Sequence, residues 1–289
     1  MAIVNRAVNK IVKPSFNLRT GPAGWLHPHW SGVIYPKTAP KGFHPLEFLA
    51  SRFDTVEINT NAHQPLRPEL SYMWLDKIRR NPNFSFTARL AKQFTHERQL
   101  EPQAVTSFSD GLRPLHRAGK LGCLLMQFPW AFRYTAENRE FLIELRRAFS
   151  EFPLVAEFRH SSWMLDEALG TLIDYRIGFV NIDQPEGMKA MPPTSFLTTS
   201  VGYVRLNGKQ HRNWFQDFGA QAGDQTPVDY MYTPEELAEW KHRIDHVAKF
   251  AASTYVIFNN DGGGRSVVNA LQMQAMLKPQ QEIAIPVAA

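Results

Sequence analysis

Short apolar runs alternate with longer amphipathic segments along most of the chain. Eight of these runs are predicted β-strands, because they are short and rich in β-branched and aromatic residues. They are residues 17–21, 54–60, 84–90, 122–129, 154–159, 178–183, 202–207 and 253–260. Alternating strands and helices favour a parallel sheet covered by helices, and eight such units close a barrel. The pattern predicts an α/β fold, a single (β/α)8 TIM-type barrel with elaborated βα loops.

Helical periodicity appears between most of these runs. The segments that show it are residues 45–53, 68–80, 136–149, 161–175, 233–251 and 264–277. The segment from Thr233 has the clearest start, since Pro234 follows the N-cap and Glu236 completes a capping box. An open doubly wound sheet is the competing fold. The glycine-rich stretch "DGGGRS" (261–266) matches neither the dinucleotide fingerprint nor the P-loop, which favours the barrel.

No linker rich in serine, glycine or proline divides the chain, so we expect one barrel domain over residues 17–278. Residues 1–16 have basic and apolar positions at helical spacing, which predicts an N-terminal basic amphipathic extension packed on the body. The same pattern also suits an arm that contacts phosphates or anionic lipid. Residues 279–289 are expected to form a C-terminal tail.

Composition and charge exclude several classes of protein. Of the 289 residues, 44% are hydrophobic and 20% are charged, which supports a sizeable core and argues against disorder. The net charge of +5 arises before Glu47, where six basic residues and no acidic one occur. The rest of the chain is near neutral, which makes a broad nucleic-acid surface the less favoured interpretation.

The compartment is predicted from what the sequence lacks. No apolar stretch approaches the roughly 18 to 20 residues that span a bilayer, and the N-terminus has no apolar core typical of a signal peptide. Cys123 is the single cysteine, so an intrachain disulfide is excluded. We therefore expect a cytoplasmic protein without a transmembrane segment.

Polar side chains gather where the predicted strands end, and in a parallel barrel these ends meet at one rim. The set is Glu57, Asn59, Arg89, Gln127, Glu157, Arg159, His160, Asn181, Asp183, Arg205, Asn207, Asn259, Asn260 and Asp261. Because side chains alternate between the two faces of a strand, one register points the charges into the barrel and the apolar positions toward the helices. We expect four pairs to share the inward face: Glu57 and Asn59, Glu157 and Arg159, Asn181 and Asp183, and Arg205 and Asn207.

The charges on strands two to seven of this set balance: the carboxylates are Glu57, Glu157 and Asp183, and the arginines are Arg89, Arg159 and Arg205. Buried charges need partners, so a purely structural layer of ion pairs is one interpretation. Arginines from separate strands that converge on one opening also suit a phosphate or carboxylate group of a ligand. We favour a pocket for a small anionic molecule, in which Arg89, Arg159 and Arg205 hold the anion.

Candidate roles follow from residue chemistry. The candidate catalytic residues, which would transfer protons, are Glu57, Glu157, His160 and Asp183. The candidate substrate-binding residues are Trp25, Asn59, Arg89, Gln127, Arg159, Arg205, Asn207, Asn260 and Asp261. For His160, capping of the helix that begins at Ser161 is an equally good explanation. For Trp25, stacking on a flat substrate competes with packing in the core, the commoner fate of tryptophan.

No cofactor and no metal ligand are predicted, although a divalent metal is not excluded. Glu57, Glu157, Asp183 and His160 have suitable ligand chemistry, but the nearby arginines would repel a cation. The favoured function is an enzyme that acts on a small anion by hydrolysis or by other acid/base chemistry, such as isomerisation. Two alternatives stay open: a nucleic-acid-binding barrel of the repair-nuclease type, and a non-catalytic ligand-binding barrel. The oligomeric state is left open.

Several motifs resemble the YecE-like family, a bacterial family of unknown function that carries the number seventy-two. The similar stretches run in order from about Leu18 to Leu277 and include "GPAGWLHPHWSGVIYP", "RFDTVEINT", "FSFTARLAKQFTH", "LMQFPWAF", "AEFRHSSW", "YVRLNG" and "FNNDGGGRSVVNAL". The most specific are Glu57-Ile58-Asn59, Glu157-Phe158-Arg159-His160-x-x-Trp163 and Phe258-Asn259-Asn260-Asp261. The resemblance implies a TIM barrel and no established reaction.

The chain departs from this family pattern at three places. Arg89 stands where relatives tend to have lysine, and Asn207 where they typically have histidine. Ala62 and His63 occupy the place of an aromatic pair. If the histidine of relatives transfers protons, the resemblance implies an altered or lost activity here.

Overall fold

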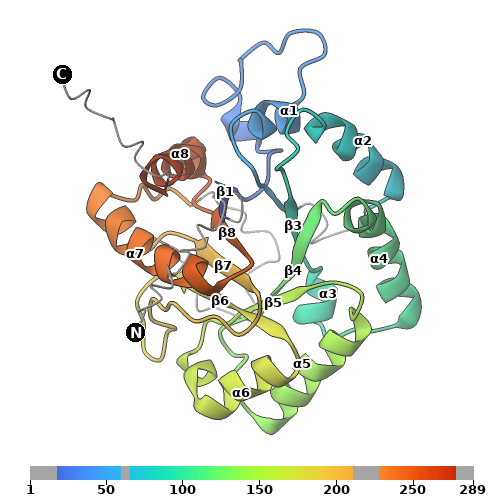
Figure 1. The fold of residues 1–289 in the computed structure, drawn as a ribbon, viewed down its shortest axis with the longest axis vertical. Helices are drawn as coiled ribbons and strands as arrows, with labels where there is room; N and C mark the ends of the chain where they lie inside the picture. The colour runs from blue at the N-terminus through green and yellow to red at the C-terminus, as the bar shows by residue number, and fades with distance from the viewer. Residues whose placement is uncertain (1–17, 60–65, 211–227, 278–289) are drawn as a thin grey trace, which may run out of the picture.

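The computed structural model describes residues 18–59, 66–210 and 228–277, and these form a closed ring of parallel strands inside a ring of helices (Figure 1). The strands are β1 (Leu18–Pro22), β2 (Glu57–Ile58), β3 (Phe86–Arg89), β4 (Leu121–Gln127), β5 (Leu154–Glu157), β6 (Ile177–Asp183), β7 (Val201–Leu206) and β8 (Ser253–Phe258). They are ordered β1-β8-β7-β6-β5-β4-β3-β2. A parallel bridge between Ala23 and Glu57 closes the ring beside β1 and β2. The predicted (β/α)8 barrel is confirmed.

Helices cover the outside of the barrel in chain order (Figure 1). They are α1 (Pro45–Ala50), α2 (Pro68–Ile78), α3 (Lys92–Thr95), α4 (Pro102–Arg117), α5 (Ala136–Ala148), α6 (Asp166–Asp174), α7 (Pro234–Phe250) and α8 (Arg265–Leu277). Three 3-10 helices lie in the loops: η2 (Pro28–Trp30), η4 (Ser161–Met164) and η5 (Gly262–Gly264). Within the described part of the chain, no helix is both long and apolar enough to cross a membrane.

Two helical predictions need correction. The segment 161–175 is not one helix, because Leu165 has an extended backbone (ψ 146°) that separates η4 from α6. The pattern also missed α4, whose interior contains Pro114. Its buried residues Phe108, Leu112 and Leu115 recur at helical spacing, which is the signal that would have revealed it.

A stack of aromatic rings outside β4 and β5 sets the direction of the neighbouring side chains. Phe158 lies 3.9 Å from Trp163 and nearly parallel to it, and Phe128 lies 4.0 Å from Phe132. The indole of Trp163 donates to the carbonyl of Phe132, which holds η4 against this layer. Since Phe158 faces the helices, the alternation of β5 turns Glu157 into the barrel, as predicted.

The connection from β6 to β7, residues 184–200, contains no helix. The side chain of Asn181 holds this segment, since its Oδ1 accepts from Thr194 Oγ1 (2.8 Å) and from the Phe196 amide (2.7 Å). Ile182 pairs with Arg205, so Ile182 faces the barrel interior while Asn181 and Asp183 face outward. The prediction that Asn181 and Asp183 face the barrel interior is wrong. Asn181 faces outward because its side chain forms hydrogen bonds with the connection 184–200, which covers β6 where a helix would otherwise lie.

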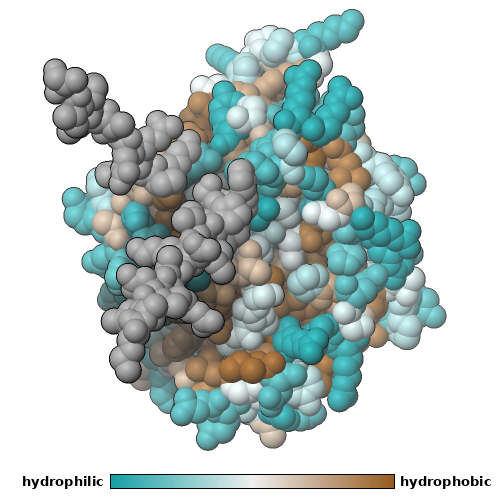
Figure 2. Space-filling model, viewed as in Figure 1, coloured by the Kyte–Doolittle hydropathy of each residue, from teal (hydrophilic) through white to brown (hydrophobic). Residues whose placement is uncertain are grey.

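The surface seen in Figure 2 fits a barrel enclosed by amphipathic helices, with hydrophilic side chains (teal) over α4 at the periphery. The predicted N-terminal extension (1–16), the tail (279–289) and the family departures at Ala62 and His63 lie outside the described residues.

Candidate functional site

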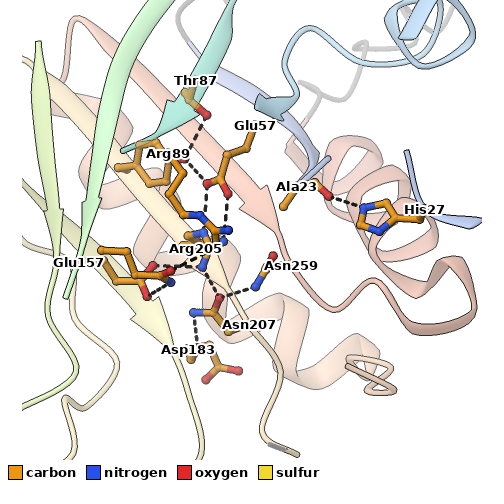
Figure 3. A network of polar contacts seen from close by, with 12 residues as sticks. Ala23, His27, Glu57, Thr87, Arg89, Glu157, Asp183, Arg205, Asn207 and Asn259 are labelled. Atoms are coloured by element: carbon orange, nitrogen blue, oxygen red, sulfur yellow. Dashed lines mark hydrogen bonds and ion pairs between the residues drawn. The ribbon is translucent and has the colours of Figure 1, made fainter. Parts of the chain in front are cut away.

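A buried ion-pair network occupies the barrel interior at the carboxyl ends of the strands (Figure 3). The Arg205 guanidinium binds both carboxylate oxygens of Glu57, at 3.0 and 2.9 Å, and it reaches Glu157 Oε2 at 3.2 Å. All three side chains are 0% exposed. The network therefore joins β2, β5 and β7 across the barrel, and Arg205 has no surface through which to contact a ligand directly.

Neighbouring polar groups complete the hydrogen bonding of this network. The Tyr203 hydroxyl donates to Glu57 Oε2 at 2.8 Å, and the Gln127 amide donates to Glu157 Oε1 at 2.7 Å. Asn207 Oδ1 accepts from Arg205 at 2.6 Å. The structural layer of ion pairs weighed as one interpretation of the sequence is thus present around Arg205.

The charges in this network hold each other ionised. Burial alone would raise the pKa of Glu57, but the charge and hydrogen bonds of Arg205 outweigh burial and lower that pKa. Burial would likewise lower the pKa of Arg205, yet the charges of Glu57 and Glu157 raise it. Glu57 therefore stays a carboxylate near neutral pH and is a poor proton donor there.

Four basic side chains lie together above this network, on the side formed by β3 and β5. They are Arg89, Lys92, His96 and Arg159, and we call them the cationic group. Arg89 ends β3 and donates to Gln127 Oε1 at 3.3 Å, while Arg159 follows β5 directly. Arg89, His96 and Arg159 are half-buried and Lys92 is exposed, so this group is accessible where Arg205 is not.

Burial, followed by repulsion from nearby positive charges, lowers the pKa of Arg89, Lys92 and His96. Burial is the largest cause, and together with the charges of Arg159, Lys92 and Arg89 it lowers the pKa of His96 to about 4. Burial also lowers the pKa of Lys92, again with help from Arg89 and Arg159. Arg89, Lys92 and Arg159 therefore concentrate positive charge around a neutral His96, and a bound anion would relieve the repulsion.

Asp183 lies behind the barrel wall rather than in its mouth. The Tyr232 hydroxyl donates to Asp183 Oδ2 at 2.6 Å and accepts from the Gly208 amide at 2.7 Å. Burial raises the pKa of Asp183 to about 6, although Tyr232 opposes that rise. Asp183 is only 2% exposed, so its place between β6 and α7 separates it from the ion-pair network.

Three other predicted site residues have contacts that explain them as parts of the fold. His160 caps η4 by accepting from the Ser162 amide at 3.1 Å, as the capping interpretation expected. Trp25 is 2% exposed and packs edge-on against Trp74, as a core residue does. The Asn260 amide donates to the Tyr230 carbonyl and to Asn269 Oδ1 behind the rim.

Asn207 is an integral part of the network. It is fully buried, its Oδ1 accepts from Asn259 at 3.1 Å, and its amide donates to the Asp183 carbonyl at 3.2 Å. Asn207 thereby couples Arg205 to β6 and β8, and it does not open onto the rim.

Two histidines near the rim were not among the predicted site residues. His27 Nδ1 lies 3.1 Å from Asp261 Oδ2, and His29 Nε2 lies 3.8 Å from the same oxygen. Asn59 is their neighbour, because a Cβ on Gly24 would lie 2.6 Å from the Asn59 amide and 2.8 Å from His27 Nε2. The His-x-His spacing of His27 and His29 was the sequence signal that would have found them.

Comparisons with known proteins agree with this architecture. A family model described as "Protein of unknown function DUF72" matches residues 19–288. The UPF0759 protein YunF of Bacillus subtilis (strain 168) is 25% identical over 260 residues, which cover 85% of this chain and 90% of that protein.

Solved structures of the same family have the same fold. The DUF72 family protein TM1631 of Thermotoga maritima MSB8 is 30% identical with a TM-score of 0.76, over 91% of this chain and 99% of that one. The DUF72 family protein EF0366 of Enterococcus faecalis V583 is 24% identical with a TM-score of 0.75, over 91% and 99%. The resemblance seen in the sequence motifs is thus confirmed, and the chain belongs to the DUF72 family of proteins of unknown function.

Proposed function

We propose that the rim of the barrel binds a small molecule through a phosphate or carboxylate group, as the substrate of an enzyme that uses acid/base chemistry. The observation that carries the proposal is the crowding of Arg89, Lys92, His96 and Arg159 with mutual repulsion. Like charges brought together at an accessible rim attract an anion, and arginine forks bind such anions bidentately.

The buried ion-pair network can orient the side chains of the cationic group for this binding role. Glu57 and Glu157 fix Arg205, and the Gln127 side chain links Glu157 to Arg89 through bonds of 2.7 and 3.3 Å. A side chain that is oriented by buried neighbours loses less conformational entropy when a ligand binds. In this proposal, Glu57, Glu157 and Arg205 position the binding residues and do not touch the substrate themselves.

In this proposal His96 accepts the proton, a role in proton transfer for which the sequence offered His160 among its candidates. With its pKa at about 4, His96 is neutral near pH 7 and can accept a proton. An anion bound at the cationic group would offset the charges of Arg159, Lys92 and Arg89, which would bring the pKa of His96 closer to neutral pH. A general base is most effective when its pKa lies near the working pH.

Replacement of Arg159 tests the binding step. In calorimetric titrations of the full-length protein with inorganic phosphate, Arg159→Gln should raise Kd about tenfold or more, because a charge-assisted contact contributes about 1.5–3 kcal/mol. Arg79→Gln is the matched control, since the Arg79 side chain is 68% exposed, pairs with Asp76 and lies at the opposite end of the barrel. Equal affinities of wild type and Arg159→Gln would contradict the proposal. Much tighter binding of a short DNA duplex would favour the nucleic-acid alternative.

The titration of His96 provides a second, independent test. Saturating phosphate should raise the pKa of His96 by about one unit or more, as expected for an opposite charge within about 4–6 Å. The measurement is an NMR titration of the histidine ring resonances, assigned by comparison with His96→Gln. His246 is exposed on α7, so its ring resonances should not change when phosphate is added and they serve as the internal control.

A further inference from the structure

Two histidines and an aspartate meet at the rim on the side of β1 and β8. His27 and His29 flank Pro28 in the loop after β1, and Asp261 follows β8. Because β1 and β8 pair in parallel from Leu18 to Pro22, the loops that follow them begin at the same edge. We call His27, His29 and Asp261 the His-Asp cluster. Among residues 18–59, 66–210 and 228–277, it is the one place where three potential metal-ligand atoms lie within 4.8 Å of one another.

We propose that the His-Asp cluster binds a divalent transition-metal ion of the zinc class. The ligand atoms would be His27 Nδ1, His29 Nε2 and Asp261 Oδ2. Two imidazole nitrogens and one carboxylate oxygen are the ligands that Zn²⁺ and its neighbours favour, whereas Mg²⁺ and Ca²⁺ prefer oxygen ligands alone. The proposal uses residues other than the cationic group, so it and the proposed anion binding can fail separately.

The contacts around the cluster orient these ligand atoms. His27 Nε2 donates to the Ala23 carbonyl at 2.9 Å (Figure 3), so Nδ1 is the nitrogen turned toward Asp261 Oδ2, 3.1 Å away. A metal ion would take the place of the proton that Nδ1 shares with this carboxylate oxygen. The Val228 amide donates to Asp261 Oδ1 at 3.2 Å, so Oδ2 is the oxygen turned toward the histidines. Metal-binding histidines commonly donate their second nitrogen to a backbone carbonyl in this way.

The loops that carry the cluster are fixed by further bonds. The Trp30 indole donates to the Asp261 carbonyl at 2.9 Å, and the His27 ring lies 4.4 Å from the Trp30 ring. Gly24 has a positive φ of 74°, and a Cβ there would lie 2.8 Å from His27 Nε2. Glycine at this position therefore lets the backbone approach His27 closely.

Metal binding requires a small adjustment and the loss of a proton at His29. His29 Nε2 lies 2.9 Å from the Asp261 carbonyl, to which it donates when that nitrogen carries the proton. Binding would move the His29 proton to Nδ1 or release it to solvent, and it would release the proton between His27 Nδ1 and Asp261 Oδ2. Tetrahedral coordination at about 2.1 Å places ligand atoms about 3.4 Å apart, so the 3.8 Å separation would shorten and the 3.1 Å separation would lengthen.

The cluster also has room for a ligand that the protein does not supply. The side chains of His27, His29 and Asp261 are 15%, 30% and 19% exposed. Structural zinc sites are closed by four protein ligands, whereas three ligands at a partly open site leave a position for water or substrate. The His-Asp cluster has the second arrangement, at the rim where TIM barrels carry their active sites.

The test is a titration of the full-length, chelator-treated protein with Zn²⁺ by calorimetry and with Co²⁺ by visible absorption. Wild type should bind one ion saturably and give the absorption bands of bound Co²⁺. His29→Gln and Asp261→Asn should each weaken binding by about 100-fold or more, because loss of even an outer partner of a metal ligand costs about 10- to 100-fold. His246→Gln on α7 is the matched control and should bind as wild type does.

Several results would overturn the assignment. Absence of saturable binding to wild type would mean that the cluster serves only to connect the two loops. Equal weakening in His246→Gln and His29→Gln would place the ion at scattered surface histidines instead. Thermal unfolding of each variant in chelator identifies misfolding. If both substitutions unfold the protein, His29→Cys, which keeps a metal ligand, must restore folding and Co²⁺ binding for the proposal to stand.

Discussion

Replacing Arg205 with methionine is expected to lower the free energy of unfolding by about 3–5 kcal/mol, the usual cost of removing one partner from a buried ion pair. The substitution keeps a long side chain in place but leaves Glu57 and Glu157, both 0% exposed, without their shared counter-charge. Chemical denaturation monitored by far-UV circular dichroism measures the difference. Arg113→Met is the matched control, because Arg113 pairs with Asp110 and Glu151 on the surface, where such pairs contribute about 1 kcal/mol or less.

The loss should also depend on pH, with a sign set by Glu57. In wild type the pKa of Glu57 is lowered, so its stabilising contribution is present above the ordinary value of 4.5 and is lost only as pH falls through the lowered pKa. Burial is the largest influence on Glu57, and without Arg205 only Arg89 and Tyr203 oppose it, so we expect that pKa to rise above its ordinary value. The variant should then lose stability as pH rises from about 5 to about 8, where wild type shows no such slope from Glu57. If Arg205→Met lowers the free energy of unfolding by the same amount at about pH 5 and about pH 8, this explanation is contradicted.

Gly111→Ala is expected to destabilise the protein by about 3 kcal/mol, although alanine is the better helix former by about 1 kcal/mol. Gly111 lies inside α4, and a Cβ there would be 2.2 Å from the Leu66 carbonyl oxygen and 2.8 Å from its carbon. Since both atoms belong to the backbone, α4 must move away from the segment before α2. That movement would also disturb the hydrogen bond from Ser71 Oγ to the Gly111 carbonyl.

Gly170→Ala provides the control for this substitution within another helix. Gly170 lies inside α6, where a Cβ would meet nothing within 4 Å, so alanine should stabilise the protein by about 0.5–1 kcal/mol. Thermal unfolding of the two variants should therefore shift the midpoint in opposite directions. A rise of both midpoints would show that helix propensity, rather than the contact with Leu66, decides the outcome.

The barrel itself was predictable because strand periodicity records which face of each strand is buried. Along β5, Ala156 and Phe158 are apolar and face the helices, so the inward direction of Glu157 followed from alternation alone. The same rule failed on β6, where polar Asn181 and Asp183 face outward. Alternation divides the side chains of a strand between two faces, but it does not say which face lies inside the barrel. The residues that bind Asn181 and Asp183 on the outer face are Phe196 and Tyr232, which belong to later segments of the chain.

The candidate site was predictable as a set of residues but not as an arrangement. The sequence indicated that arginines and carboxylates meet at the rim, yet it treated Arg89, Arg159 and Arg205 as equivalent. Their difference arises from depth: Arg205 is fully buried between two carboxylates, whereas Arg89 and Arg159 are half-buried above it. The burial of each arginine depends on how far along the barrel axis its strand places it. The residues around one strand do not determine that position. The His-Asp cluster was overlooked because Asp261 is more than 230 positions away from His27 and His29.

The position of Arg205 in the chain bears on how fast the protein folds and unfolds. Arg205 is 148 positions from Glu57 and 48 positions from Glu157, so the complete network requires β2, β5 and β7 to be assembled. Contacts between such distant segments are formed after much loop entropy has been lost, which places them late in folding. Interactions that are absent from the folding transition state act mainly on the unfolding rate. The ion pair at the centre of the barrel would then govern the lifetime of the folded protein more than the speed at which it folds.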